Sequence, residues 1–251
     1  MNLTLMIDKG EKKTQRWERQ SLKSIAELIE KNEREYPVMV ILGAPGSGKS
    51  TILRRLEQTY IREQIEAGGD RLCFFVPLNR YKAGKGENPV TPLQFLESRW
   101  AESFKSTGWT LEGVLTTGKV LLLLDAVNEI QHRSSEEYGE LIGLWREFAI
   151  DQKSKGNRII FTCRTLDYSQ LLSSVEMRVP NVDLQPLTPE KTAEFLKAYL
   201  PERHEEVLQA IRRDGTLDFY NNPYFLSLLC QQIEEGGAIP KGRASLFTGY
   251  V

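Results

Sequence analysis

Residues Gly43-Ala44-Pro45-Gly46-Ser47-Gly48-Lys49-Ser50 are the stretch that decides the fold of this chain. They match the pattern GxxxxGK(S/T), whose glycines allow backbone N–H groups to turn inward around a phosphate. The apolar run Val38–Leu42 before them has the length of a buried strand. After them, apolar residues recur at helical spacing at Leu53, Leu56 and Tyr60. Because a chance match rarely lies between such a strand and such a helix, the stretch predicts a phosphate-binding loop at a helix N-terminus.

The side chains of this loop predict its chemistry. Lys49 should reach the β- and γ-phosphates of a nucleotide, and the Ser50 hydroxyl should bind Mg²⁺. The residues expected to contact the nucleotide are Gly43, Ala44, Pro45, Gly46, Ser47, Gly48, Lys49, Ser50 and Thr51.

The rest of the chain alternates apolar runs with helical patterns. Strands are expected near residues 38–42, 72–76, 120–124, 158–163 and 182–185. Helices are expected between them, for example at residues 92–104 and 136–149. This alternation predicts right-handed βαβ crossovers, and hence an α/β fold of the P-loop NTPase type: a parallel sheet with helices on both faces.

The two ends of the chain show only helical patterns. After Pro186 these cover residues 189–200, 205–213 and 223–233. Before Pro37, helical spacing follows a possible N-cap at Ser21, in Leu22, Ile25, Ala26 and Ile29. We expect an N-terminal helical segment at residues 1–36, a nucleotide-binding domain at 37–186 and a small helical subdomain at 187–251.

A second candidate site follows the apolar run Val120–Leu124. Asp125 comes directly after it, where a P-loop fold holds its magnesium partner. Asp125 alone would be explained equally well as the cap of a turn, but the phosphate-binding loop favours magnesium. Glu129 could polarise the attacking water as a general base, whereas Asn128 could only orient it.

Two further residues are candidates. Arg164 follows the predicted strand at residues 158–163, and can sense a γ-phosphate if that strand lies beside Val38–Leu42. A surface arginine after a strand is the common alternative. Asn222 and Pro223 are explained by themselves as an N-cap and first residue of a helix.

Composition excludes several classes of protein. The chain has 33 basic and 34 acidic residues, a net charge of -1, so nothing in its charge indicates nucleic-acid binding. Its three cysteines and two histidines lack metal-ligand spacing. The apolar runs are too short to span a bilayer, and the first residues lack the order of a signal peptide. We therefore expect a cytoplasmic protein.

In this order, the motifs resemble a NACHT domain, a branch of the STAND class of P-loop NTPases. Residues 42–51 resemble the family's Walker A motif, 120–130 its Walker B motif and 161–168 its sensor 1 strand and arginine. Residues 184–196 and 221–230 are similar to its helical-domain motifs, and 239–251 to the approach to its winged-helix domain. The resemblance covers about residues 36–251.

The resemblance implies a switch that holds ADP at rest, exchanges it for ATP on a trigger, and oligomerises. It also implies that Pro223 packs near the adenine of the nucleotide. The preference for adenine over guanine comes from the resemblance, because the residues alone do not settle it. Family members serve in innate immunity, and bacterial members often in defence against phage. The implied partners are other domains of the same protein, a sensor and an effector, with the present chain as a fragment.

The chain departs from the family pattern Asp-Gly-x-Asp-Glu. Ala126 replaces the glycine, and Asn128 replaces the second aspartate, which favours slow hydrolysis. An AAA+ type machine or helicase loader, a small-molecule kinase and a scaffold that binds ADP without turnover are the alternatives. The first would usually have glutamate at position 126, and the second would need an acceptor pocket and a basic lid.

Overall fold

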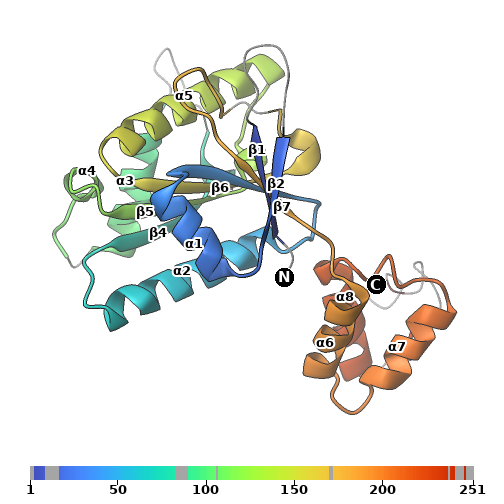
Figure 1. The fold of residues 1–251 in the computed structure, drawn as a ribbon. Helices are drawn as coiled ribbons and strands as arrows, with labels where there is room; N and C mark the ends of the chain where they lie inside the picture. Colours follow the sequence, from blue (N-terminus) through green and yellow to red (C-terminus); the bar gives the residue numbers. More distant parts are fainter. Residues whose placement is uncertain are drawn as a thin grey trace. The chain divides into compact units, whose positions relative to one another are not determined.

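The computed structural model describes residues 3–8, 17–82, 90–105, 107–169, 172–236, 238–240 and 246, which form two compact units (Figure 1). The larger, here called the sheet unit, comprises Leu3–Ala44 and Lys49–Asp183. The smaller, here called the helical unit, includes Leu184–Val251 and the loop tip Pro45–Gly48.

A seven-stranded sheet of order β2-β1-β7-β3-β6-β5-β4 is the centre of the fold. Five strands from β7 to β4 run parallel, and β1 and β2 form an antiparallel pair at one edge. This confirms the predicted α/β fold. The strands are β1 (Leu3–Asp8), β2 (Trp17–Leu22), β3 (Val38–Gly43), β4 (Leu72–Pro77), β5 (Val120–Asp125), β6 (Arg158–Arg164) and β7 (Asn181–Leu184).

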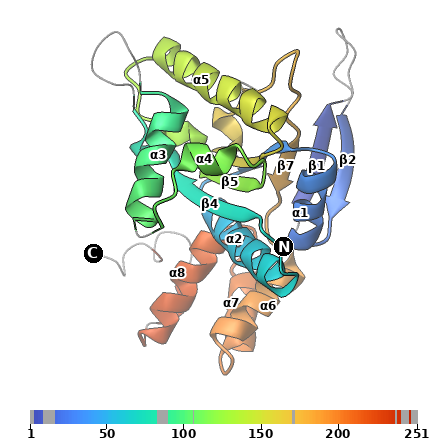
Figure 2. The same ribbon diagram turned by 90° about the vertical axis from the view of Figure 1, so that its left-hand side faces the viewer.

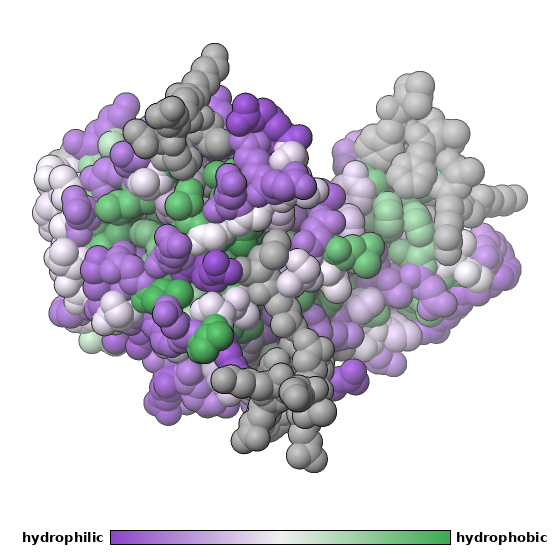
Figure 3. Space-filling view, turned by 90° about the horizontal axis from the view of Figure 1, so that it is seen from above, coloured by the Kyte–Doolittle hydropathy of each residue, from purple (hydrophilic) through white to green (hydrophobic). Residues whose placement is uncertain are grey.

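Helices cover both faces of the sheet (Figures 1 and 2). One face carries α1 (Ile25–Arg34) and α2 (Lys49–Glu66), and the other carries α3 (Pro92–Ser103), α4 (Leu111–Leu115) and α5 (Ser135–Ser154). Short 3₁₀ turns follow β4, β5 and β6: η1 (Leu78–Arg80), η2 (Val127–Glu129) and η3 (Thr165–Asp167). In Figure 3, hydrophobic side chains on the face of the larger part form separate areas among hydrophilic ones, as on a solvated surface.

The central strands are buried on both faces, as their unbroken apolar runs predict. Every residue of β3 and β5 is buried. On the α5 side, Trp145 is fully buried and meets the rings of Tyr81, Phe95 and Phe161 edge to face. Because β3, β6 and β5 are parallel neighbours, their carboxyl ends lie along one edge of the sheet.

The N-terminal segment differs from the helical segment predicted for residues 1–36. Helix α1 begins only after Ser24, whose hydroxyl accepts the Glu27 N–H at 3.1 Å, so the N-cap is Ser24 rather than Ser21. Leu22 ends β2 instead of beginning the helix. The two short strands show no clear period-2 alternation of apolar residues, and the dense charges from residue 9 onward also suit a solvated helix.

The helical unit contains α6 (Pro189–Tyr199), α7 (His204–Arg213) and α8 (Pro223–Glu234). Thr188 and Asn222 cap α6 and α8, each followed by proline at the first helical position. The buried core of the unit includes Leu196, Val207 and Leu229. In the part of the chain that the structure describes, no helix has the length and apolar character needed to cross a bilayer.

Candidate functional site

The loop from Gly43 to Lys49 joins β3 to α2. Gly46 and Gly48 have φ of 72° and 91°, a left-handed conformation that glycine adopts without a steric cost. Lys49 is the first residue of α2, an 18-residue helix whose N-terminal N–H groups and dipole favour an anion. The local chain therefore has the geometry of a phosphate cradle.

The Lys49 ammonium lies over the start of this loop. It donates to Gly43 O at 2.8 Å and Ala44 O at 2.9 Å. Burial lowers the pKa of Lys49, nearby Arg164 lowers it further, and the carboxylates of Asp125 and Glu129 act in the opposite direction. The four predicted catalytic residues, Lys49, Asp125, Glu129 and Arg164, are thus close enough to influence one another, and a bound anion would favour the charged lysine.

Ser47 provides a test of whether phosphate fits. Among the described residues its Oγ is buried without a hydrogen-bonding partner, an arrangement that costs free energy unless an additional acceptor or donor is supplied. A phosphate oxygen is such an acceptor. Ser50 and Thr51 are exposed at the start of α2, so the Ser50 hydroxyl is accessible to a cation beside the phosphate.

Asp125 ends β5 and is held by Thr162 from the neighbouring strand. Thr162 is fully buried; its hydroxyl donates to Asp125 Oδ1 at 2.5 Å and accepts the Ala126 N–H at 2.8 Å. No motif in the sequence predicts this role for Thr162. In the described part of the chain Oδ2 of Asp125 has no such partner, so one carboxylate oxygen is oriented and the other is left for a cation.

Arg164 lies where the sequence predicted. β6 pairs with β3, and Gly43 lies opposite Arg164 in the register. The Arg164 backbone N–H donates to Asn128 Oδ1 at 3.1 Å, and its Nη2 donates to Glu129 Oε1 at 3.2 Å. Asn128 therefore ties η2 to the end of β6, a role that only the register reveals. The Arg164–Glu129 pair is about half exposed, so a ligand can compete for either partner.

Pro223 belongs to the helical unit. Asn222 accepts the Tyr224 N–H at 3.0 Å through Oδ1 and, within the same unit, donates to Pro45 O at 2.9 Å. A Cβ on Gly46 would lie 2.7 Å from the Cβ of Tyr224, so glycine is required there for space as well as for φ. The contact of Pro223 with an adenine stays a prediction.

The sheet and its loop-to-helix turn define a P-loop nucleotide-binding α/β protein. Within that class, the chain belongs to the NACHT domain family, whose model matches residues 37–203. The predicted resemblance is thereby confirmed. Comparison with curated proteins found no match.

Three solved structures are similar to the chain. The chain is similar to a Walker-type ATPase of Pyrococcus abyssi, with a TM-score of 0.55 and 17% identity over 90% of this chain and 70% of that one. It is also similar to the Orc1 protein of Aeropyrum pernix in complex with DNA, with a TM-score of 0.51 and 13% identity over 90% and 63%. The third is a Signal Transduction ATPase with Numerous Domains (STAND) protein from Pyrococcus horikoshii, which has a tetratricopeptide repeat sensor. Its TM-score is 0.47 and its sequence identity is 14%, over 91% of this chain and 32% of that one. For the first two, identities this low show a common fold alone.

Proposed function

We propose that the chain is an ATP- and ADP-binding molecular switch of NACHT type that hydrolyses ATP slowly with Mg²⁺. The proposal rests chiefly on one observation: Gly43, Asp125 and Arg164 end three adjacent parallel strands, β3, β5 and β6, at one edge of the sheet. In parallel sheets this edge is where ligands bind.

Each residue then has a definite task. The loop amides and Lys49 bind the phosphates, while Ser50 and Asp125 hold the cation and Thr162 keeps Asp125 in position. Mg²⁺, when bound, would neutralise negative charge on the phosphates. Glu129 orients and deprotonates the attacking water, and Arg164 stabilises charge on the γ-phosphate.

Slow turnover is proposed from the loop after β5. Asn128 occupies the position where the family often has a second carboxylate. In addition, the ion pair between Glu129 and Arg164 must break before Glu129 can act on water. A scaffold that binds ADP and never hydrolyses ATP is the limiting case of this argument. An Asn128→Asp variant restores the carboxylate and should increase phosphate release.

From the family we further propose a cytoplasmic signalling role in innate immunity, with defence against phage the leading form in a bacterium. ATP would then change the arrangement of domains and favour a homo-oligomer, because only a ligand that prefers one state shifts the equilibrium. Sensor and effector domains of the same protein would supply the trigger and the response.

The first test is to denature the purified chain and identify the released nucleotide by chromatography. We expect ADP near one per chain, slow phosphate release from added Mg-ATP, and neither from Lys49→Ala. The matched control is Lys197→Ala, at an exposed position in α6. Bound ADP without phosphate release would favour the scaffold, and a guanine nucleotide would overturn the base assignment. A chain that holds no nucleotide and does not bind Mg-ATP would refute the switch.

A further inference from the structure

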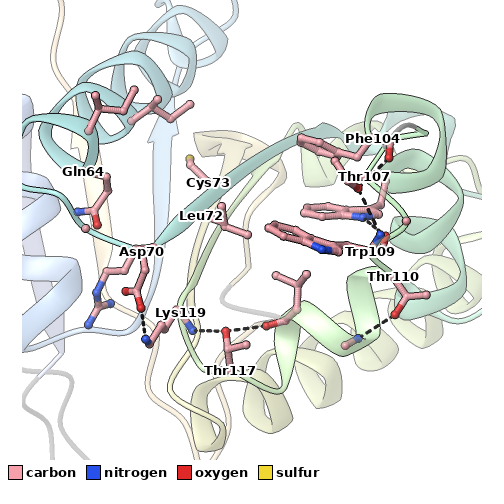
Figure 4. Close-up of a pocket in the computed structure, with 18 residues that line it drawn as sticks. Gln64, Asp70, Leu72, Cys73, Phe104, Thr107, Trp109, Thr110, Thr117 and Lys119 are labelled. Atoms are coloured by element: carbon pink, nitrogen blue, oxygen red, sulfur yellow. Dashed lines mark hydrogen bonds and ion pairs between the residues drawn. The ribbon is translucent and has the colours of Figure 1, made fainter.

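A large cavity lies at the edge of the sheet formed by β4. Its volume is about 1010 Å³, and its lining includes Ile61 and Ile65 of α2, Leu72 and Cys73 of β4, and Trp109. Figure 4 shows Leu72 and Cys73 between α2 and the aromatic rings of Phe104 and Trp109. A second hollow of about 460 Å³ continues along β4 toward Pro77. The two together are called the β4 groove here.

The groove has an apolar rim in contact with solvent. Ile65 is 75% exposed, Trp109 61% and Ile61 41%. Two of them, Ile61 and Ile65, are one helical turn apart on α2 and so share a face. Large apolar side chains gathered around one hollow mark a binding surface, whereas single exposed ones need no explanation.

The backbone of β4 is free along this groove. Leu72 donates its N–H to Lys119 O at 2.9 Å, so the parallel ladder with β5 uses Leu72 and then alternate residues of β4. Cys73 and Phe75 therefore turn their N–H and C=O groups the other way. β4 is the last strand of the sheet, and no described residue pairs with that side. Pro77 falls on the same side, where its missing N–H costs no ladder bond.

This edge lacks the usual protection against pairing. Edge strands are normally guarded by charged residues, and β2 at the opposite edge carries exposed Arg19. β4 reads Leu-Cys-Phe-Phe-Val-Pro, without a charge. Arg54 lies over the Phe75 ring at 3.5 Å and shields only one face. An uncharged strand edge beside an apolar hollow is the arrangement that accepts an added strand.

Charge indicates which strand it would accept. The groove is lined by five cationic side chains and three carboxylates. Arg54, Arg99 and Lys119 each form an ion pair with one of these carboxylates, so the positive excess comes from Arg71 and Arg80. Opposite charge on the partner favours association. We propose that the β4 groove binds an extended peptide segment of a partner protein, with apolar side chains at alternate positions and a net negative charge, as an added strand on β4.

The test uses the whole chain and a synthetic peptide of about ten residues that alternates valine or isoleucine with glutamate. Amide exchange is followed residue by residue by NMR. In the free protein, Cys73 and Phe75 amides should exchange faster than those of Leu72, Phe74 and Val76. Added peptide should slow exchange at Cys73 and Phe75 by about tenfold or more, because both amides gain acceptors.

Two controls alter the peptide and use the same unaltered protein. A version with N-methyl groups on the amides that face β4 should give no protection, and a lysine version should bind about tenfold more weakly at low salt. On the protein, Ile65→Gln removes an apolar side chain of the rim without adding charge and should weaken binding. Val175→Gln, at a 98% exposed position outside the groove, should not. Unchanged exchange at Cys73 and Phe75 with saturating peptide would overturn the proposal. Equal binding of the N-methylated peptide would also overturn it, because the groove would then capture apolar groups without adding a strand.

Discussion

Ala126 is held in the left-handed conformation, with φ of 62°, directly after Asp125. A side chain there costs roughly 1–2 kcal/mol, whereas glycine would cost about 0.5–1 kcal/mol in unfolded-chain entropy. We expect Ala126→Gly to raise the free energy of unfolding by about 0.5–1 kcal/mol. Urea denaturation measures this free energy. The control is Ala101→Gly, on the exposed side of α3, which should lower the free energy of unfolding by about 1 kcal/mol. A loss at both positions would contradict the strain argument.

Thr162 acts through Asp125, so it is a positioning residue. Thr162→Val keeps the shape but leaves Asp125 Oδ1 and the Ala126 N–H without a partner, at a cost of about 2–4 kcal/mol in stability. We expect it to reduce the gain in nucleotide affinity that Mg²⁺ provides, with affinity in the absence of Mg²⁺ kept within about twofold. Thr162→Ser should restore both. If the two affinities fell together, the hydroxyl would be supporting the fold generally rather than the cation site.

At the scale of elements, η2 and the end of β6 form one connected piece through Arg164. Because the Arg164–Glu129 pair is half exposed, Arg164→Ala should change stability by less than about 1 kcal/mol. ATP affinity should fall about tenfold or more, because the charge-assisted hydrogen bonds to the γ-phosphate are lost. ADP affinity should stay unchanged, because ADP has no γ-phosphate. Titrations with both nucleotides measure the ratio. Glu129→Gln breaks the same pair but keeps the cation, so an equal loss of ATP affinity there would refute the sensing role.

The sequence predicted the elements that carry one dominant pattern. The buried strands β3 and β5 and the capped helices α3 and α8 were expected within a residue or two, since an unbroken apolar run favours a buried strand and a proline at N1 favours a helix start. The hairpin of β1 and β2 was missed, because short strands stabilised by pairing leave little local pattern. Likewise Lys49 and Asp125 were predicted as site residues from their type and position. The bonds of Thr162 and Asn128 depend on which strands are neighbours, and one sequence does not reveal register.

At the scale of the whole molecule, the two units can be followed separately. All four tryptophans, at positions 17, 100, 109 and 145, fall within the sheet unit, so tryptophan fluorescence reports the unfolding of that unit alone. Each unit also contains free thiols: Cys73 and Cys163 in the sheet unit, and Cys230 in the helical unit. Together these features allow the stability of one unit to be measured against pH.

Stability of the sheet unit should fall in alkali because burial raises the pKa of Cys163 to about 11, from an ordinary value of 9.0, and raises that of Cys73 as well. Between those pH values the thiol keeps its proton in the folded state and loses it in the unfolded state. Deprotonation therefore stabilises the unfolded state relative to the folded one. The stabilisation is complete below the unfolded value and is lost as pH rises toward the folded one; the lowered pKa of Lys49 opposes this loss. From about pH 8.5 to about pH 10, each thiol should remove about 1 kcal/mol from the free energy of unfolding reported by tryptophan. Cys163→Ala should flatten that decline by one thiol's share, and Cys230→Ala should leave it unchanged. An unaltered slope in Cys163→Ala would show that the Cys163 thiol is not protected by the fold.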